Sequence, residues 1–270
     1  MSNFYGASFI FNGTPSEYYD LYINTSETTA NNSVGILSTN PGDVTLYSQA
    51  IYRRPIPFFW GVQQSNPLEF DVTFNSLTEL TAEDARIISR WLFGQQSFQK
   101  LQIMQYDLQN IFFQCFLTKP MTLYVGNTIR GFQAHVVCNA PWGFEYPKTT
   151  TYTYTTPNVN VTTIINNTSD NNFYTYPSMV ITTGAFANAD INITNTTDNS
   201  RLFSFSGMSA GEVLTVNNDL QIISSSTGLL RLSNFNKHWF RFLQGVNSVN
   251  IQGEIASVSF TYSPARKVGG

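Results

Sequence analysis

Short runs in which apolar and polar residues alternate recur along most of this 270-residue chain, and they limit it to folds built from half-buried strands. The clearest run is "LEFDVTFNSL", which places Leu68, Phe70 and Val72 on one face of an extended chain. Only 11% of the residues are charged, and Asn, Thr, Ser and Gln supply much of the polarity. These short polar side chains favour turns and sheet faces over helices, so the sequence predicts an all-β protein.

One stretch departs from the alternation. "TAEDARIISRWLFG" spans residues 81–94, begins with Thr81 as an N-cap and ends at Gly94, a residue suited to the end of a helix. At 3.6 residues per turn, its apolar residues Ala85, Ile88, Trp91 and Leu92 fall on one face. The sequence therefore predicts a single helix that packs this face on the strands.

Changes in composition divide the chain into parts. We expect a first β-sandwich domain over residues 1–147, in which the apolar-poor segment 25–57 forms an extended hairpin arm with a turn at Asn40-Pro41-Gly42-Asp43. Residues 148–172, rich in Thr and Asn, read as a junction that includes some strand material. Evenly spaced short strands over residues 173–270 predict a second β-sandwich.

Charge and hydropathy exclude some classes of protein. The net charge of -3 disfavours a nucleic-acid binder, which needs a basic surface. The first residues lack a secretory signal, and no apolar run approaches the roughly eighteen residues of a membrane span, so we expect neither.

Cys115 and Cys138 both lie in apolar strand-like runs. The two cysteines could form one disulfide, but two buried free thiols are the favoured interpretation.

No set of residues predicts catalysis or metal binding. His135 and His238 fall in different domains, and neither has the further Cys, His or carboxylate ligands that zinc requires. "DINITNTTDNSR" from Asp190 begins like a calcium loop, but Asn195 and Arg201 occupy its glycine and glutamate positions. We therefore expect no metal, no cofactor and no enzymatic activity.

One aromatic group suggests a binding contact. In "NKHWFRF", a strand would place Lys237, Trp239 and Arg241 on one face and direct Phe240 and Phe242 to the core. A tryptophan between two cations suits either a stacked sugar or a contact with a partner or a neighbouring loop. We favour the partner or intramolecular contact over the sugar.

The order of elements is specific in "GVQQSNPLEFDVTFNSLTELTAEDARIISRWLFGQQSFQKLQI", in the later "CNAPWGFEYP" and in the opening "FYGASFIFNG". In this order of elements, the chain resembles the distal tail proteins of bacteriophages with long non-contractile tails. The resemblance implies an N-terminal β-sandwich with one helix and an extended arm, six copies of which form a ring. It also implies a galectin-like C-terminal β-sandwich on the outside of that ring.

The function implied by this resemblance is a structural hub at the tail tip of the virion, made in the cytoplasm of the bacterial host. Such a hub joins the tail tube to the tip or baseplate, including a tail-associated lysin-type protein and receptor-binding proteins, and leaves a channel for DNA. It binds no membrane and no specific nucleic-acid sequence. The alternative is a carbohydrate-binding adhesin or receptor-binding tail protein; a hydrolase is disfavoured because catalytic groups are not assembled.

Overall fold

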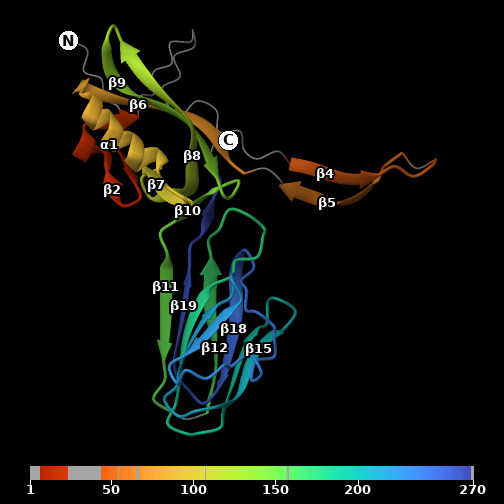
Figure 1. Ribbon diagram of the computed structural model, residues 1–270. Coiled ribbons are helices and arrows are strands. Elements are labelled where there is room, and N and C mark those ends of the chain that lie inside the picture. The colour runs from red at the N-terminus through yellow and green to blue at the C-terminus, as the bar shows by residue number, and fades with distance from the viewer. Residues whose placement is uncertain are drawn as a thin grey trace. The chain divides into compact units, whose positions relative to one another are not determined.

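The computed structural model describes residues 7–23, 44–53, 55–64, 67–106, 108–156 and 158–268. It divides into two compact units (Figure 1). The first unit runs to Glu145 and also includes the end of the chain from Arg266, and the second comprises Tyr146–Ala265. Strands dominate the described residues, which contain one α-helix and one short 3-10 helix. The predicted fold class, all-β with one helix, is confirmed.

Apart from a separate two-stranded hairpin, the described strands of the first unit form one sheet in the order β2-β1-β7-β8-β9-β6-β3, and β10 and β20 pair at its margin. Hydrogen bonds between Ala7 and Ile23 join β3 to the residues just before β1, so the sheet curls round. The expected first sandwich is therefore built as one folded sheet. Its strands are β1 (Phe9–Phe11), β2 (Thr14–Pro15), β3 (Leu21–Ile23), β6 (Glu69–Leu80), β7 (Gln99–Ile103), β8 (Ile111–Val125), β9 (Thr128–Cys138), β10 (Gly143–Glu145) and β20 (Ala265–Arg266), and the 3-10 helix η1 (Ser16–Tyr19) follows β2.

The helix expected over residues 81–94 is present as α1 (Ala82–Phe93). Thr81 and Asp84 form a capping box, in which the Thr81 hydroxyl accepts from the Asp84 backbone N–H and the Asp84 carboxylate accepts from that of Thr81. The helix buries Ala85, Ile88 and Leu92 in the core of the first unit. Among the described residues, no helix is both long and apolar enough to cross a membrane.

The arm contains a reversal of the chain that the sequence analysis did not predict. β4 (Val44–Gln49) and β5 (Phe58–Gln64) pair with each other as an antiparallel hairpin whose last partners are Gln49 and Phe58. The reversal therefore lies in residues 50–57, where Pro55 and Pro57 lack the N–H groups that pairing requires. The predicted turn at residues 40–43 lies outside the described residues.

The second unit is a sandwich of two antiparallel sheets. Five strands follow the order β11-β19-β13-β16-β17, and four follow the order β12-β18-β14-β15, among the described residues. The inward side chains of both sheets form one apolar core. The strands are β11 (Lys148–Thr153), β12 (Val159–Asn167), β13 (Ser178–Thr183), β14 (Ala189–Asn195), β15 (Arg201–Met208), β16 (Val213–Asn217), β17 (Ile222–Ser225), β18 (Gly245–Gly253) and β19 (Ile255–Tyr262).

The observed division differs from the expected boundaries at both ends of the second unit. The segment 148–172, expected as a junction, supplies β11 and β12 to the sandwich. Its alternating Thr and Tyr residues suit a strand, and the hydroxyls of Thr149 and Thr151 lie 2.8 Å from those of Thr261 and Ser259 on β19. At the other end the chain returns to the first unit, where Val268 packs on the apolar core.

Candidate functional site

The two histidines lie in different units and have different surroundings. His135 lies on β9, where Nδ1 is 2.7 Å from Asp71 and Nε2 is 3.1 Å from Glu69, both on the neighbouring strand β6. The ring is thus held between two carboxylates on the outer face of the sheet. His238 is exposed, and its backbone N–H donates to the Asn236 side chain. Among the residues that the structure describes, no Ser, Thr or Cys side chain hydrogen-bonds to either imidazole ring.

The segment that resembles a calcium loop is a strand. Asp190, Asn192 and Thr194 belong to β14, which pairs with β15 on one side and with β18 on the other. A paired strand cannot wrap its side chains around one ion as a calcium loop does. In the described parts of the chain, no group of His, Cys, Asp and Glu is arranged to hold a metal ion.

The residues predicted to flank Trp239 lie in three different settings. Lys237 is exposed and has a left-handed backbone (φ 64°), so the extended alternation begins only after it. Trp239 is half-buried and packs edge-on against Phe235, with ring centroids 4.8 Å apart. Phe240 and Phe242 are buried in the core, although residues 237–244 form no regular strand. A sugar or partner contact at Trp239 stays a prediction.

Arg241 is held within the second unit. Its guanidinium donates to both carboxylate oxygens of Asp198, at 2.7 and 3.1 Å, and lies 3.5 Å from the centroid of the Tyr174 ring. These hydrogen bonds to Asp198 raise the pKa of Arg241 above its usual value. Because its donors are directed at Asp198, Arg241 contributes little to a sugar platform around Trp239.

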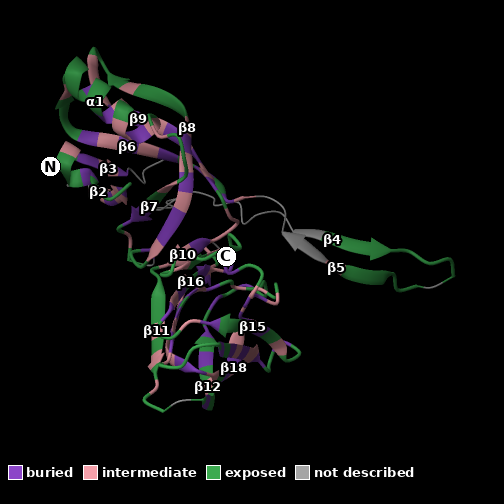
Figure 2. Ribbon diagram, turned by 60° about the horizontal axis from the view of Figure 1, so that its bottom comes forward, coloured by how far each residue is buried: buried purple, intermediate pink, exposed green. Residues whose placement is uncertain are grey.

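The hairpin β4–β5 carries an apolar surface that the sequence analysis did not identify. Large apolar side chains are exposed along it, and residues 46–53 and 55–60 are green in Figure 2. Phe59 is 64% exposed and Trp60 is 70% exposed. We define the hairpin surface as Leu46, Ile51, Tyr52, Ile56, Phe59 and Trp60. An apolar group of this size on one hairpin is typical of an interaction site.

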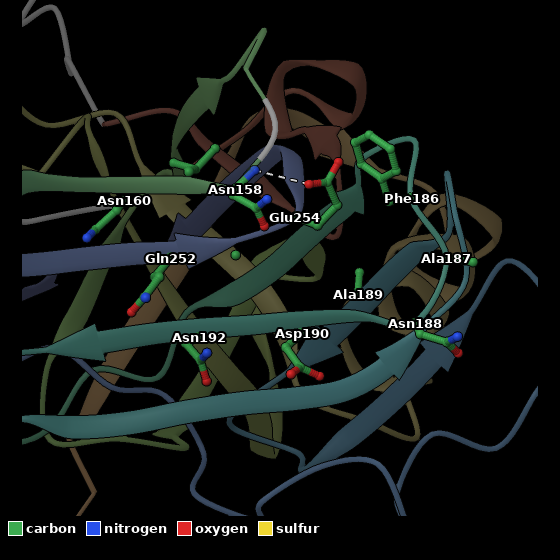
Figure 3. Close-up of a pocket in the computed structure, with 12 residues that line it drawn as sticks. Asn158, Asn160, Phe186, Ala187, Asn188, Ala189, Asp190, Asn192, Gln252 and Glu254 are labelled. Carbon is green, nitrogen blue, oxygen red and sulfur yellow. Dashed lines mark hydrogen bonds between the residues drawn. The ribbon is translucent and has the colours of Figure 1, made fainter.

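A pocket in the second unit is another candidate site (Figure 3). Its volume is about 590 Å³, within the usual range for small-ligand sites. It is lined by the starts of β12 and β14, the end of β18 and the loop before β14. Its polar side chains are Asn158, Asn160, Asn188, Asp190, Asn192, Gln252 and Glu254. The sequence analysis missed it, and its one signal, the "DINITN" segment, suggested calcium instead.

Two family matches together span almost the whole chain. Residues 4–140 match the phage tail protein N-terminal domain, and residues 142–262 match the phage tail C-terminal domain. The chain belongs to this family of phage tail proteins. A comparison with curated proteins gave no match for this phage tail protein.

Solved structures show which fold this phage tail protein shares. The Dit protein of phage SPP1, described as a paradigm of the hub adsorption apparatus in phages that infect Gram-positive bacteria, is 12% identical with a TM-score of 0.64. The alignment covers 95% of this chain and 98% of the SPP1 protein. A chain of the activated phage P2 baseplate is 10% identical with a TM-score of 0.52, over 97% of this chain and 99% of the other. The resemblance to distal tail proteins is thus confirmed.

Proposed function

We propose that this phage tail protein is the structural hub of a tail tip, in which six copies form a closed ring. The ring joins the tail tube to the tip or baseplate and leaves a central channel for DNA. The protein is made in the cytoplasm of the bacterial host and assembled into the virion. Family membership and the fold shared with the SPP1 Dit protein support this role.

The observation that carries the proposal is the hairpin surface. A two-stranded hairpin is at best marginally stable alone, because it cannot bury a face between only two strands. β4 and β5 pair with no further described strand, and Phe59 and Trp60 are exposed on them. Docking on another molecule would bury these rings and stabilise the hairpin.

We assign that docking surface to a neighbouring copy of the same chain. A hairpin that docks on a different surface of the next copy makes a head-to-tail contact, and repeated head-to-tail contacts close into a ring when the rotation permits. The number six rests on the resemblance to distal tail proteins. The remaining proposed partners are the tail tube protein, a tail-associated lysin-type protein and receptor-binding proteins.

Mass measurement by light scattering after size-exclusion chromatography tests the ring. The wild-type protein should elute at about six times the 30.4 kDa chain mass, or at a multiple that indicates stacked rings. The double variant Phe59→Ser and Trp60→Ser should lose this assembly and keep its circular dichroism spectrum. Leu230→Ser, which changes a residue 92% exposed in the second unit, is the matched control and should still assemble.

A monomeric wild-type protein, or a double variant that still forms the ring, would contradict this proposal. The alternative, a carbohydrate-binding adhesin, predicts a monomer or a trimer in the same measurement. That outcome would remove the hub from consideration and leave the second unit as the functional part of the chain.

A further inference from the structure

We propose that the pocket of the second unit binds an uncharged saccharide. This inference goes beyond the hub function, because the residues that carry it lie in the second unit and the hairpin surface lies in the first. It also places a sugar at a different part of that unit from Trp239, which does not line the pocket.

Strand register builds the floor of the pocket. Asn160 on β12 and Asn192 on β14 are both register partners of Gln252, which lies on the strand β18 between them. Partners in register point to the same face of a sheet, so the three carboxamides form a row at intervals of about 4.8 Å. All three side chains are exposed or half-exposed. The row presents donors and acceptors to a ligand that lies across the strands.

One amide of this row is oriented by a neighbour. The Nδ2 of Asn250 donates to Oδ1 of Asn160 at 3.1 Å. The carbonyl of Asn160 is therefore directed at Asn250, and its NH₂ group is left to donate elsewhere. A sugar hydroxyl both accepts and donates hydrogen bonds, so it complements carboxamides better than a group that only donates or only accepts.

Phe186 supplies an apolar wall. It lies in the loop between β13 and β14, lines the pocket and is 59% exposed. In Figure 3 its ring is on the same side of the pocket as Glu254, while Asp190 and Asn192 are on the other. An aromatic face beside hydrogen-bonding groups suits a sugar ring, whose faces carry C–H groups and whose edge carries hydroxyls.

Glu254 is a buried carboxylate at the pocket, with only 6% of its surface exposed. Its Oε2 accepts from the Asn158 backbone N–H at 3.0 Å (Figure 3). Its Oε1 lies where a side chain on Gly184 would be, since a Cβ there would come within 2.2 Å of it. Among the described residues, no Lys or Arg forms an ion pair with Glu254, so no neighbouring cation neutralises this carboxylate.

The charges of the lining select the class of ligand. The described lining contains two carboxylates, Asp190 and Glu254, and no Lys, Arg or His. Phosphate, sulfate and uronate groups would meet like charges in a half-enclosed site, which raises the free energy of binding. A cation would use the carboxylates but leave the amide N–H groups of the carboxamide row unused. An uncharged polyhydroxylated ligand can hydrogen-bond to both the carboxylates and the amide N–H groups.

Calorimetry with the full chain tests the proposal. The probes are tetramers of glucose, galactose and N-acetylglucosamine, and a galacturonate tetramer is the anionic comparison. At least one neutral tetramer should bind with saturation, and galacturonate should bind more than tenfold more weakly. Phe186→Ala and Gln252→Ala change side chains at the surface of the pocket, and each should weaken the binding more than tenfold. Trp239→Ala should leave it within twofold.

The proposal would be overturned if none of the three neutral tetramers bound at millimolar concentration. Tighter binding of galacturonate, or binding that survives both pocket substitutions, would also overturn it. Loss of binding in Trp239→Ala alone would move the sugar to that surface. Light scattering on the same samples separates this result from the hub proposal, because the pocket variants should assemble like the wild-type protein.

Discussion

Arg231 and Glu212 form a bidentate ion pair buried in the second unit, with Nε 2.8 Å from Oε1 and Nη2 2.5 Å from Oε2. The hydroxyl of Ser225 and the backbone N–H of Ser209 also donate to the Glu212 carboxylate. Burial alone would raise the pKa of Glu212, but these hydrogen bonds outweigh it and lower the pKa to about 2. The carboxylate is therefore far more acidic in the folded protein than in the unfolded chain.

This difference predicts a pH dependence of stability. A carboxyl whose pKa falls from 4.5 to about 2 on folding stabilises the folded state above pH 4.5 and loses that contribution as the pH falls towards 2. The loss should be about 3 kcal/mol. Hydrogen exchange of the β16 amides in urea, at pH 7, 4.5 and 2.5, measures it for the second unit. The paired variant Glu212→Gln with Arg231→Met is the control, and parallel pH curves for it and the wild-type protein would contradict the assignment.

The tryptophan of α1 provides a second prediction. The Trp91 ring is half-buried, lies 4.8 Å from Tyr19 and 5.9 Å from Phe9 between centroids, and donates its Nε1–H to the Phe11 carbonyl at 3.3 Å. Trp91→Ala should reduce the free energy of unfolding of the first unit by about 2–4 kcal/mol. Arg90→Ala changes an exposed neighbour and should cost under about 0.5 kcal/mol in the same urea titration. Equal losses would show that the face of the helix is wrongly assigned.

The periodicity of apolar residues correctly located the elements that bury one face in a core and leave the other face exposed. In β6 the residues Phe70, Val72 and Phe74 are buried, as the alternation indicates. The same signal predicted a strand in "NKHWFRF", where Phe240 and Phe242 are buried but no regular strand forms. Alternation reports which side chains enter the core, and it does not report whether the backbone is paired with a neighbour.

The arm and the pocket show what local sequence cannot supply. Strands β4 and β5 reverse over residues 50–57, a reversal that the sequence analysis did not predict, because turn propensity does not decide which segments pair. The pocket collects residues from three distant segments, 158–160, 186–192 and 252–254. Their contact depends on the pairing of β18 with both β12 and β14, a long-range register that a single sequence does not determine.

A third prediction concerns the thiols of the first unit. Cys115 and Cys138 are register partners on β8 and β9, and both are buried and free. Burial raises the pKa of Cys115, and it raises that of Cys138 from 9.0 to about 12. At pH 8 the reactive thiolate of Cys138 should therefore be about 1,000-fold rarer than in an exposed cysteine. Ellman's reagent should react slowly with the native protein. After unfolding in guanidinium without a reductant, it should react rapidly with both thiols. Rapid reaction in the native state, or no free thiol after unfolding, would contradict this.

The fourth prediction concerns the end of the chain, which the sequence assigned to the second domain. Arg266 donates from Nε to the Glu145 carboxylate at 2.6 Å, and Val268 packs on the apolar core of the first unit. Deleting residues 266–270 should therefore destabilise the first unit, by about 1–2 kcal/mol, since it removes a half-buried side chain and a partly exposed ion pair. Hydrogen exchange should accelerate in β10 and stay unchanged in β13. Glu145→Gln removes only the ion pair and should reproduce the smaller part of the effect. Acceleration confined to β13 would mean that these residues stabilise the second unit, and that an N-terminal fragment ending at residue 147 is complete without them.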